Sequence, residues 1–158
     1  ASKIIPADIY INIQGDEPLI EPNDIEKVIN KSIENPDRII NAMCQIYDES
    51  DFINPSVPKV VCSLSGRLLY MSRAPIPLNK KNEFRSAMKQ VCIYAFPKNE
   101  LQKFGEKNIK TPLEMIEDIE IIRFLEMGLK VEMVEVSGAS IAVDFPEDIE
   151  KVISVLND

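Results

Sequence analysis

Short apolar runs alternate with helix-like stripes along the first third of the chain. Residues 8–13 read Asp-Ile-Tyr-Ile-Asn-Ile, which predicts a strand buried on much of its surface. A helix is predicted next, because Asn23 and Glu26 have the spacing of a capping box and an apolar stripe follows them. Residues 39–46 predict a second strand. The order strand, helix, strand is typical of α/β proteins.

The middle of the chain has the pattern of a hairpin followed by a longer strand. Residues 59–64 and 68–71 are apolar and β-branched and flank a Ser-Gly turn, which predicts two antiparallel strands. Residues 86–96 contain another extended apolar run, and residues 98–104 predict a short helix.

The last third returns to alternating helix and strand. Thr111-Pro-Leu-Glu114 has the signature of a helix start, and the apolar stripe after it continues to Gly128, so one helix is predicted over this span. Residues 130–136 predict a strand, and residues 146–156 predict a final helix. Four apolar residues of that helix are expected to face inward: Ile149, Val152, Ile153 and Leu156. The whole pattern predicts one α/β domain over residues 1–158, with a mostly parallel sheet and an inserted antiparallel flap at residues 58–96.

Composition narrows the class of protein and the available chemistry. The chain has 158 residues, of which 45% are hydrophobic, and no apolar run approaches the roughly 18 residues of a membrane helix. We therefore expect a cytoplasmic protein without membrane contact. The absence of histidine excludes Ser-His-Asp and Cys-His nucleophile pairs and most zinc sites. The three cysteines lie in apolar runs and are expected to be buried free thiols: Cys44, Cys62 and Cys92.

Charge is unevenly distributed along the chain. The net charge is −8, yet residues 65–110 carry ten basic and three acidic side chains. This basic segment is either a solvated face or a surface that meets an anion. A nucleic-acid partner is disfavoured, because the chain as a whole is acidic and lacks both a recognition-helix pattern and an aromatic ladder.

Two acidic turns are the places where chemistry is expected. The first is Gln14-Gly-Asp-Glu-Pro18, directly after the first strand, where Asp16 is either part of a plain turn or a ligand for a hard cation such as magnesium. The second is Val143-Asp-Phe-Pro-Glu-Asp148, where Asp144 either caps the last helix together with Glu147 or faces the same crevice as Asp16. Two carboxylates beside a nucleotide triphosphate can hold magnesium.

Several motifs occur in the order found in one family of enzymes. They are Gln14-Gly-Asp-Glu-Pro-Leu-Ile20, Asn54-Pro55 followed by Lys59-Val-Val61, Leu69-Tyr-Met-Ser-Arg-Ala-Pro-Ile-Pro77, Ile93-Tyr94, Thr111-Pro-Leu-Glu114, the Glu117/Glu120/Arg123 helix and Val143-Asp-Phe-Pro-Glu-Asp148. With these motifs the chain resembles the 3-deoxy-manno-octulosonate cytidylyltransferases, the CMP-Kdo synthetases. The resemblance implies an α/β, Rossmann-like nucleotide-diphospho-sugar transferase fold, and a homodimer formed through residues 58–96. It also implies transfer of CMP from CTP to a sugar acid, with release of pyrophosphate, for lipopolysaccharide assembly.

The resemblance also assigns roles to individual residues. Asp16 and Asp144 would hold the catalytic magnesium, and Gln14 would line the sugar pocket. Arg73 would pair with the carboxylate of the sugar acid, a role for which a planar guanidinium is better suited than an ammonium group. Two further residues, Tyr94 and Glu120, match positions that bind the sugar.

Three departures from the family pattern limit what is carried over. Gln90 stands where the family usually has a histidine of the sugar site, and Ile121 stands where it has a glutamine. A site that loses hydroxyl-binding groups discriminates against its old ligand, so the sugar is expected to be Kdo or a relative with altered substituents. The third departure is that the 158 residues contain no basic, glycine-containing loop of the kind that holds the CTP phosphates.

The missing loop leads to an expectation about the extent of the chain. We expect residues 1–158 to be the C-terminal two thirds of the enzyme, without its first strands, and to be inactive alone. Two alternatives stay open: a non-catalytic binding or regulatory domain that retains the scaffold, and a nucleotidyltransferase for an acylneuraminate or another sugar.

Overall fold

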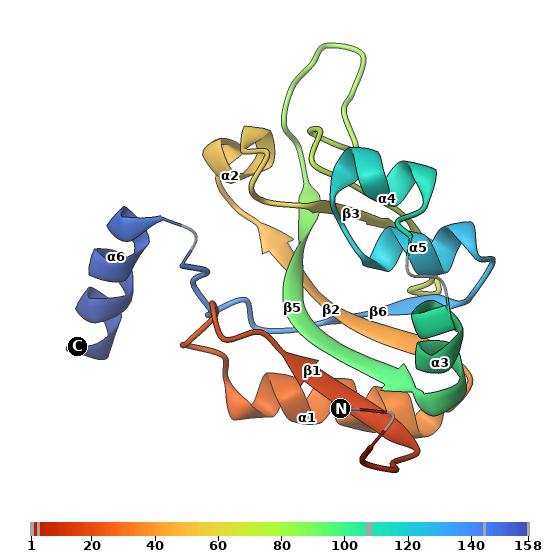
Figure 1. Ribbon diagram of the computed structural model, residues 1–158. Helices are drawn as coiled ribbons and strands as arrows, with labels where there is room; N and C mark the ends of the chain where they lie inside the picture. The colour runs from red at the N-terminus through yellow and green to blue at the C-terminus, as the bar shows by residue number, and fades with distance from the viewer. Residues whose placement is uncertain (1, 3, 107–108, 144, 158) are drawn as a thin grey trace.

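One mixed sheet with helices on both faces organises the chain in the computed structural model, which describes residues 2, 4–106, 109–143 and 145–157 (Figure 1). The strands are β1 (Ile9–Ile13), β2 (Ile39–Ile46), β3 (Lys59–Cys62), β4 (Leu68–Ser72), β5 (Ala87–Pro97) and β6 (Val131–Glu135). The helices are α1 (Pro22–Glu34), α2 (Glu49–Ile53), α3 (Lys98–Glu106), α4 (Pro112–Glu117), α5 (Ile121–Glu126) and α6 (Pro146–Leu156).

The sheet differs from the prediction in the direction of its strands. Its order is β4-β3-β5-β2-β6, with β1 also paired to β5, and among the described strands only β2 and β6 pair in parallel. The expectation of a mostly parallel sheet is therefore wrong for these residues. The reason is that β1, β2 and β6 do point the same way, but β5 runs in the opposite direction between β1 and β2. Helix α1 thus crosses over β5 to join two strands that are not neighbours.

Strand β5 forms the centre of the sheet and determines where a site can open. On one edge it pairs with β2, and on the other edge its first residues pair with β3 and its last residues with β1. Between β3 and β1, residues 90–92 of β5 have no described strand beside them on that edge. The predicted β3–β4 hairpin is confirmed, but residues 87–96 of the segment predicted as a flap belong to this central strand.

The two faces of the sheet carry separate hydrophobic cores. On one face, Val28 of α1 packs with Ile40, Ala42, Val91 and Ile93. On the other face, residues of α5 and its preceding turn pack against β2, β4 and β6; they are Ile119, Ile121, Ile122 and Phe124. Strand β2 contributes to both cores, since its successive side chains point to opposite faces.

The predicted helix from Thr111 to Gly128 is interrupted. Helix α4 ends at Glu117, and Asp118 has the left-handed backbone conformation with φ of 52° before α5 begins at Ile121. An apolar stripe does not reveal such a break, because Asp is tolerated in left-handed conformations and its neighbours keep the periodicity. The capping box predicted at Thr111 is confirmed: the Glu114 carboxylate accepts the Thr111 N–H at 3.0 Å.

Two other helix predictions need correction. Helix α1 already begins at Pro22, so Asn23 lies inside the helix and caps nothing. At α6 the Asp148 carboxylate, not that of Glu147, accepts the Phe145 N–H at 3.1 Å.

The apolar face of α6 is also not buried as predicted. Val152 is 7% exposed, but Ile149 and Ile153 are about half exposed and Leu156 is 69% exposed. Figure 1 shows the reason, since α6 projects away from the sheet. None of the helices in the described ranges is long and apolar enough to cross a membrane.

Candidate functional site

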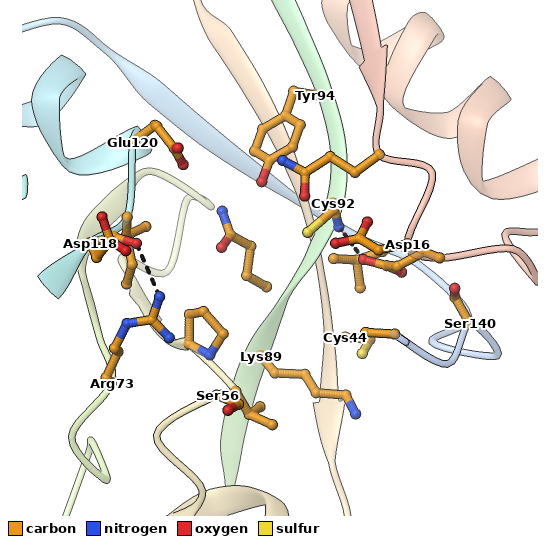
Figure 2. A pocket seen from close by; sticks show the side chains of 18 residues that line it. Asp16, Cys44, Ser56, Arg73, Lys89, Cys92, Tyr94, Asp118, Glu120 and Ser140 are labelled. Carbon is orange, nitrogen blue, oxygen red and sulfur yellow. Dashed lines mark hydrogen bonds between the residues drawn. The ribbon is translucent and has the colours of Figure 1, made fainter. Parts of the chain in front are cut away.

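A polar pocket of about 280 Å³ lies where the edge of β5 is left open between β3 and β1 (Figure 2). It is also bordered by the turns that follow the carboxyl ends of β1 and β6, the position at which open α/β sheets bind ligands. Six of the seven residues predicted for the site line this pocket: Gln14, Asp16, Arg73, Gln90, Tyr94 and Glu120. The seventh, Asp144, lies outside the described residues.

The turn after β1 brings Asp16 to the pocket wall beside the C-terminal segment. The exposed carboxylate of Asp16 borders the pocket, and its backbone carbonyl accepts the Val143 N–H at 2.8 Å. The buried Asp24 holds the same segment in place, because its carboxylate accepts the Ser137 N–H at 3.0 Å. The two acidic turns of the sequence therefore come together in space, at Asp16 and Val143.

Glu17 is a site residue whose role the sequence did not predict. It is 8% exposed, and its carboxylate accepts the backbone N–H of Cys92 at 2.8 Å. Cys92 lies in the stretch of β5 that has no strand beside it, so Glu17 satisfies a backbone donor that would otherwise be unpaired. The sequence feature that pointed to Glu17 is the pair of acidic residues in the Gln-Gly-Asp-Glu-Pro turn. This pair does not show which carboxylate accepts a backbone hydrogen bond and which one is free to bind a metal.

The guanidinium of Arg73 lies at the pocket wall and is fixed by backbone carbonyls. Its Nε donates to the Glu117 carbonyl at 2.6 Å, Nη1 to that of Pro55 at 2.8 Å and Nη2 to that of Asp118 at 3.0 Å. Figure 2 shows Arg73 beside Asp118, across the pocket from Asp16. A group held in this way presents its remaining N–H donors in a fixed orientation.

Loop 54–58 forms part of the same pocket wall, and the buried side chain of Lys59 stabilises this loop. Lys59 is completely buried, and its Nζ donates to the Asn54 carbonyl at 2.8 Å. Burial, together with the nearby charge of Arg73, lowers the pKa of Lys59. The Asn-Pro-x-x-x-Lys motif is thus explained by the support of a loop.

Gln90 and Tyr94 project from β5 into the pocket. The Gln90 amide donates to Asn41 Oδ1 at 2.9 Å, and buried Asn41 in turn donates to the carbonyls of Val91 and Ile93. Tyr94 is 6% exposed. Burial, with smaller contributions from Cys92 and Glu120, raises the pKa of Tyr94, so its hydroxyl stays protonated and can donate a hydrogen bond.

A second pocket of about 230 Å³ continues from the first through three shared residues, Gln14, Tyr94 and Glu120. Its other lining residues are mostly apolar: Asn12, Phe96, Leu101, Phe104, Ile121 and Phe124. The exposed Glu120 therefore lies at the junction of a polar and an apolar pocket. Ile121, which stands where the resembled family has a glutamine, lines the apolar pocket.

Lys89 is a further pocket residue that the sequence reasoning missed. Its Nζ lies 2.9 Å from the Asp51 carboxylate, and the side chain borders the polar pocket. Lys89 and Arg73 are the cations among the described lining residues, beside four acidic ones: Asp16, Glu17, Asp118 and Glu120. An anionic ligand would therefore be recognised by a small number of fixed positive groups.

The cysteines at the pocket are not nucleophiles. Burial raises the pKa of the Cys44 thiol to about 11 and that of Cys92 to about 12. Because the thiolate is the reactive form, both thiols are inert near neutral pH. The prediction of free cysteines is confirmed, with Cys44 buried and Cys62 and Cys92 partly buried.

Magnesium is the metal that the resemblance implies for this pocket. Within the described ranges no group of three or more acidic, histidine or cysteine side chains is close enough together to hold a metal ion. Magnesium bound with a nucleotide needs fewer protein ligands, because phosphate oxygens and water complete its shell. The exposed carboxylate of Asp16, together with Asp144 next to Val143 in the chain, fits that requirement in donor type.

This fold and pocket define a class of protein. A mixed α/β sheet with a polar pocket beside its open edge is the arrangement of a nucleotidyltransferase-like domain. Residues 1–134 match the family model described as cytidylyltransferase. The chain therefore belongs to the cytidylyltransferase family.

Individual relatives agree with this assignment. The chain is 39% identical to the 3-deoxy-manno-octulosonate cytidylyltransferase of Geobacter sulfurreducens, over 96% of this chain and 65% of that protein. It is 34% identical to the enzyme of that name from Escherichia coli, over 96% of this chain and 61% of the relative. The chain thus spans somewhat less than two thirds of the length of these relatives.

Solved structures show the same fold. A CMP:2-keto-3-deoxy-manno-octonic acid synthetase complexed with CTP matches with a TM-score of 0.89 and 32% identity, over 99% of this chain and 64% of that structure. The 4-diphosphocytidyl-2C-methyl-D-erythritol synthase from Anaerococcus prevotii has a TM-score of 0.58 at 13% identity, over 96% of this chain and 60% of that structure. The second likeness concerns the fold alone. The predicted nucleotide-diphospho-sugar transferase fold is confirmed.

Proposed function

We propose that this chain provides the sugar-binding part of a magnesium-dependent cytidylyltransferase, which transfers CMP from CTP to a 3-deoxy-2-ulosonic acid and releases pyrophosphate. The observation that carries the proposal is the convergence of six predicted substrate and metal residues on one pocket. The named relatives act on 3-deoxy-manno-octulosonate, and the similar structure contains CTP, which agrees with both substrates. We expect this reaction to take place in the cytoplasm and its product to be used in lipopolysaccharide assembly.

The chain's own residues would bind and orient the sugar acid. Arg73 offers a fixed guanidinium to the carboxylate of the sugar. The protonated Tyr94 hydroxyl, the Gln14 and Gln90 amides and the Glu120 carboxylate can bind hydroxyl groups. Holding the sugar in this way would orient its anomeric hydroxyl for attack on the α-phosphorus of CTP. Magnesium held by Asp16 and Asp144 would supply charge stabilisation for the phosphates.

A homodimer is part of the same proposal. The hairpin and the loop after it expose apolar side chains, among them Leu64, Leu69 and Leu78, within the segment that resembles a dimer interface. Light scattering on the complete protein would give the mass of two chains, and the mass of one chain would contradict this part of the proposal.

The proposed reaction is tested by direct assay. The complete protein, with whatever segments extend beyond residues 1–158, is expected to release pyrophosphate from CTP only when magnesium and a 3-deoxy-2-ulosonic acid are both present. Residues 1–158 alone are expected to release none, because they contain no basic, glycine-containing loop for the triphosphate. Pyrophosphate release by residues 1–158 alone would show that another basic segment holds CTP. Release from the complete protein only with an acylneuraminate or a sugar phosphate would overturn the choice of sugar, and binding without turnover would favour the non-catalytic alternative.

The departures at Gln90 and Ile121 lead to a prediction about sugar specificity. Each residue lines one of the two joined pockets, so both can contact substituents of the sugar ring or its side chain. The double variant Gln90→His/Ile121→Gln is expected to raise kcat/KM for Kdo relative to deoxy or amino relatives, because it restores groups that bind hydroxyls. Competition between paired sugar acids measures this ratio, and an unchanged ratio would mean that the two departures do not encode specificity.

A further inference from the structure

Glu117 is a partly buried carboxylate behind the pocket, and its hydrogen bonds all come from β4 and the residue that follows it. It accepts the Ser72 hydroxyl at 2.7 Å, the Arg73 backbone N–H at 2.8 Å and the Tyr70 hydroxyl at 3.3 Å. Burial works against ionisation of Glu117, but these hydrogen bonds outweigh it and hold the pKa of Glu117 below its ordinary value. The side chain is therefore ionised near neutral pH. It is not among the residues that line either pocket.

The same residue also contacts the side chain of Arg73 through its backbone. The carbonyl of Glu117 accepts Arg73 Nε, and the next carbonyl, that of Asp118, accepts Nη2. The carboxylate of Glu117 thus holds the backbone of Arg73, and the backbone carbonyl of Glu117 holds its guanidinium. The left-handed Asp118 turns the chain at this point, and Glu120 follows at the pocket wall.

Charge supplies a second, independent reason for a carboxylate at this position. Lys59 and Arg73 are two neighbouring cations, and burial and the charge of Arg73 both lower the pKa of Lys59. The charge of Glu117 acts in the opposite direction on Lys59. Asp51 acts on Lys59 in the same direction as Glu117, so the loss of Glu117 would leave less negative charge near this pair of cations.

We propose that Glu117 is a positioning residue for substrate recognition: it holds Arg73 in the orientation that binds the carboxylate of the sugar acid. This inference rests on the proposed function for the identity of the ligand. Glu117 acts through Arg73 and touches neither substrate. The positioning role also explains why the side chain of Glu117 connects residues 70–73 to the interrupted helix pair α4 and α5.

The test compares Glu117→Gln with a matched control on the same helix pair. Glu126 also accepts backbone hydrogen bonds, from Leu113 and Glu114 at 3.1 Å, but among the described residues it does not line either pocket and forms no hydrogen bond with Arg73. In the complete protein, Glu117→Gln is expected to raise KM for the sugar acid about tenfold, with KM for CTP and kcat within about twofold. Glu126→Gln is expected to change none of the three. Equal rises in both KM values, or an unchanged sugar KM, would overturn the proposal.

A double-variant cycle separates positioning from general loss of structure. Arg73→Lys already removes the oriented fork, so Glu117→Gln combined with Arg73→Lys is expected to raise the sugar KM no further than Arg73→Lys alone. Multiplication of the two effects would contradict the mechanism. Ser72→Ala removes the shortest hydrogen bond to the Glu117 carboxylate and replaces Glu117→Gln in this test if that variant does not fold. We expect Ser72→Ala to raise KM for the sugar acid by a smaller factor. An unchanged KM would contradict the proposal.

A spectroscopic readout makes this test independent of the reaction. The Nε–H of Arg73 is hydrogen bonded to the Glu117 carbonyl at 2.6 Å, so its side-chain ¹⁵N resonance, identified by its loss in Arg73→Lys, is expected to exchange slowly with water. Exchange should accelerate in Glu117→Gln and stay slow in Glu126→Gln. If the wild-type protein shows no sugar turnover, the proposed function fails while this measurement still decides the positioning role. Unchanged exchange in Glu117→Gln overturns the positioning role even in an active enzyme.

Discussion

Replacing Asp16 with asparagine is expected to reduce kcat of the proposed cytidylyl transfer by the complete protein by at least about 100-fold, without unfolding it. The carboxylate borders the pocket and is exposed to solvent, so an amide of the same size fits without strain. An amide is, however, a poorer ligand for a hard divalent cation. Steady-state assays over a range of magnesium concentrations measure the loss, and far-UV circular dichroism checks the fold.

Asp144→Asn is the companion variant, because the proposal has both carboxylates share one ion. We expect a loss of similar size, and no further loss when the two substitutions are combined. The thermal stability of Asp144→Asn needs to be measured in parallel, since this residue stands two positions before α6 begins at Pro146. Near-normal turnover by either single variant would refute a shared magnesium site.

Glu114→Gln is expected to lower the free energy of unfolding by about 3–5 kcal/mol, the largest effect on stability that we predict. Glu114 is completely buried, and its carboxylate accepts Nε and Nη2 of Arg123 at 2.5 and 2.6 Å. The variant leaves the guanidinium of Arg123, which is 9% exposed, with a neutral partner in place of a charged one. It also weakens the hydrogen bond that caps α4 at Thr111.

Chemical denaturation of residues 1–158, or of the complete protein, measures this loss. Asp37→Asn is the matched control, because Asp37 forms an exposed ion pair with Lys130 at 3.3 Å that solvent screens. The control variant should unfold at nearly the wild-type denaturant concentration. If Glu114→Gln loses no more stability than Asp37→Asn, the buried pair does not have the role assigned to it.

The same pair predicts how stability depends on pH. Burial opposes ionisation of Glu114, but the hydrogen bonds from Arg123 and Thr111 hold its pKa below the ordinary value. A lowered pKa in the folded state means that the stabilisation is fully present above the pKa of the unfolded chain and is lost as the pH falls through that of the folded state. The wild-type protein should therefore lose stability on the acid side more steeply than Glu114→Gln.

Local sequence pattern was sufficient to identify most helices and strands. Apolar alternation and β-branched residues identified the strands, because side chains on a strand repeat every two residues. Proline and the Thr-x-x-Glu spacing identified the starts of α4 and α6, because these signals act within one helical turn. The resemblance of the motifs to one family predicted which side chains gather at the pocket, and six of the seven lie there.

Strand direction and the interruption of a helix were decided by tertiary structure. The pairing of β5 between β1 and β2 depends on residues more than 40 positions apart, and no local period encodes which strands become neighbours. Asp118 adopts a left-handed conformation where its carbonyl accepts a hydrogen bond from Arg73. Arg73 lies 45 positions away in the sequence, so the local pattern of apolar residues contains no information about this contact. The apolar stripe therefore continues through the interruption of the helix.

The sequence by itself therefore predicted most residues of the candidate site, and the tertiary structure determined which groups each of them contacts. Gln14, Asp16, Arg73 and Tyr94 were identifiable from motifs, since their residue types suit the chemistry of binding a sugar acid and a metal. The roles of Glu17 and Glu117 were not identifiable in the same way. Both are carboxylates in acidic motifs, and only the fold shows that they accept backbone N–H groups of β5 and of the residue after β4. The physical reason is that a carboxylate binds a metal, a sugar or a backbone donor equally well, and its choice depends on which donor the folded chain brings within hydrogen-bonding distance.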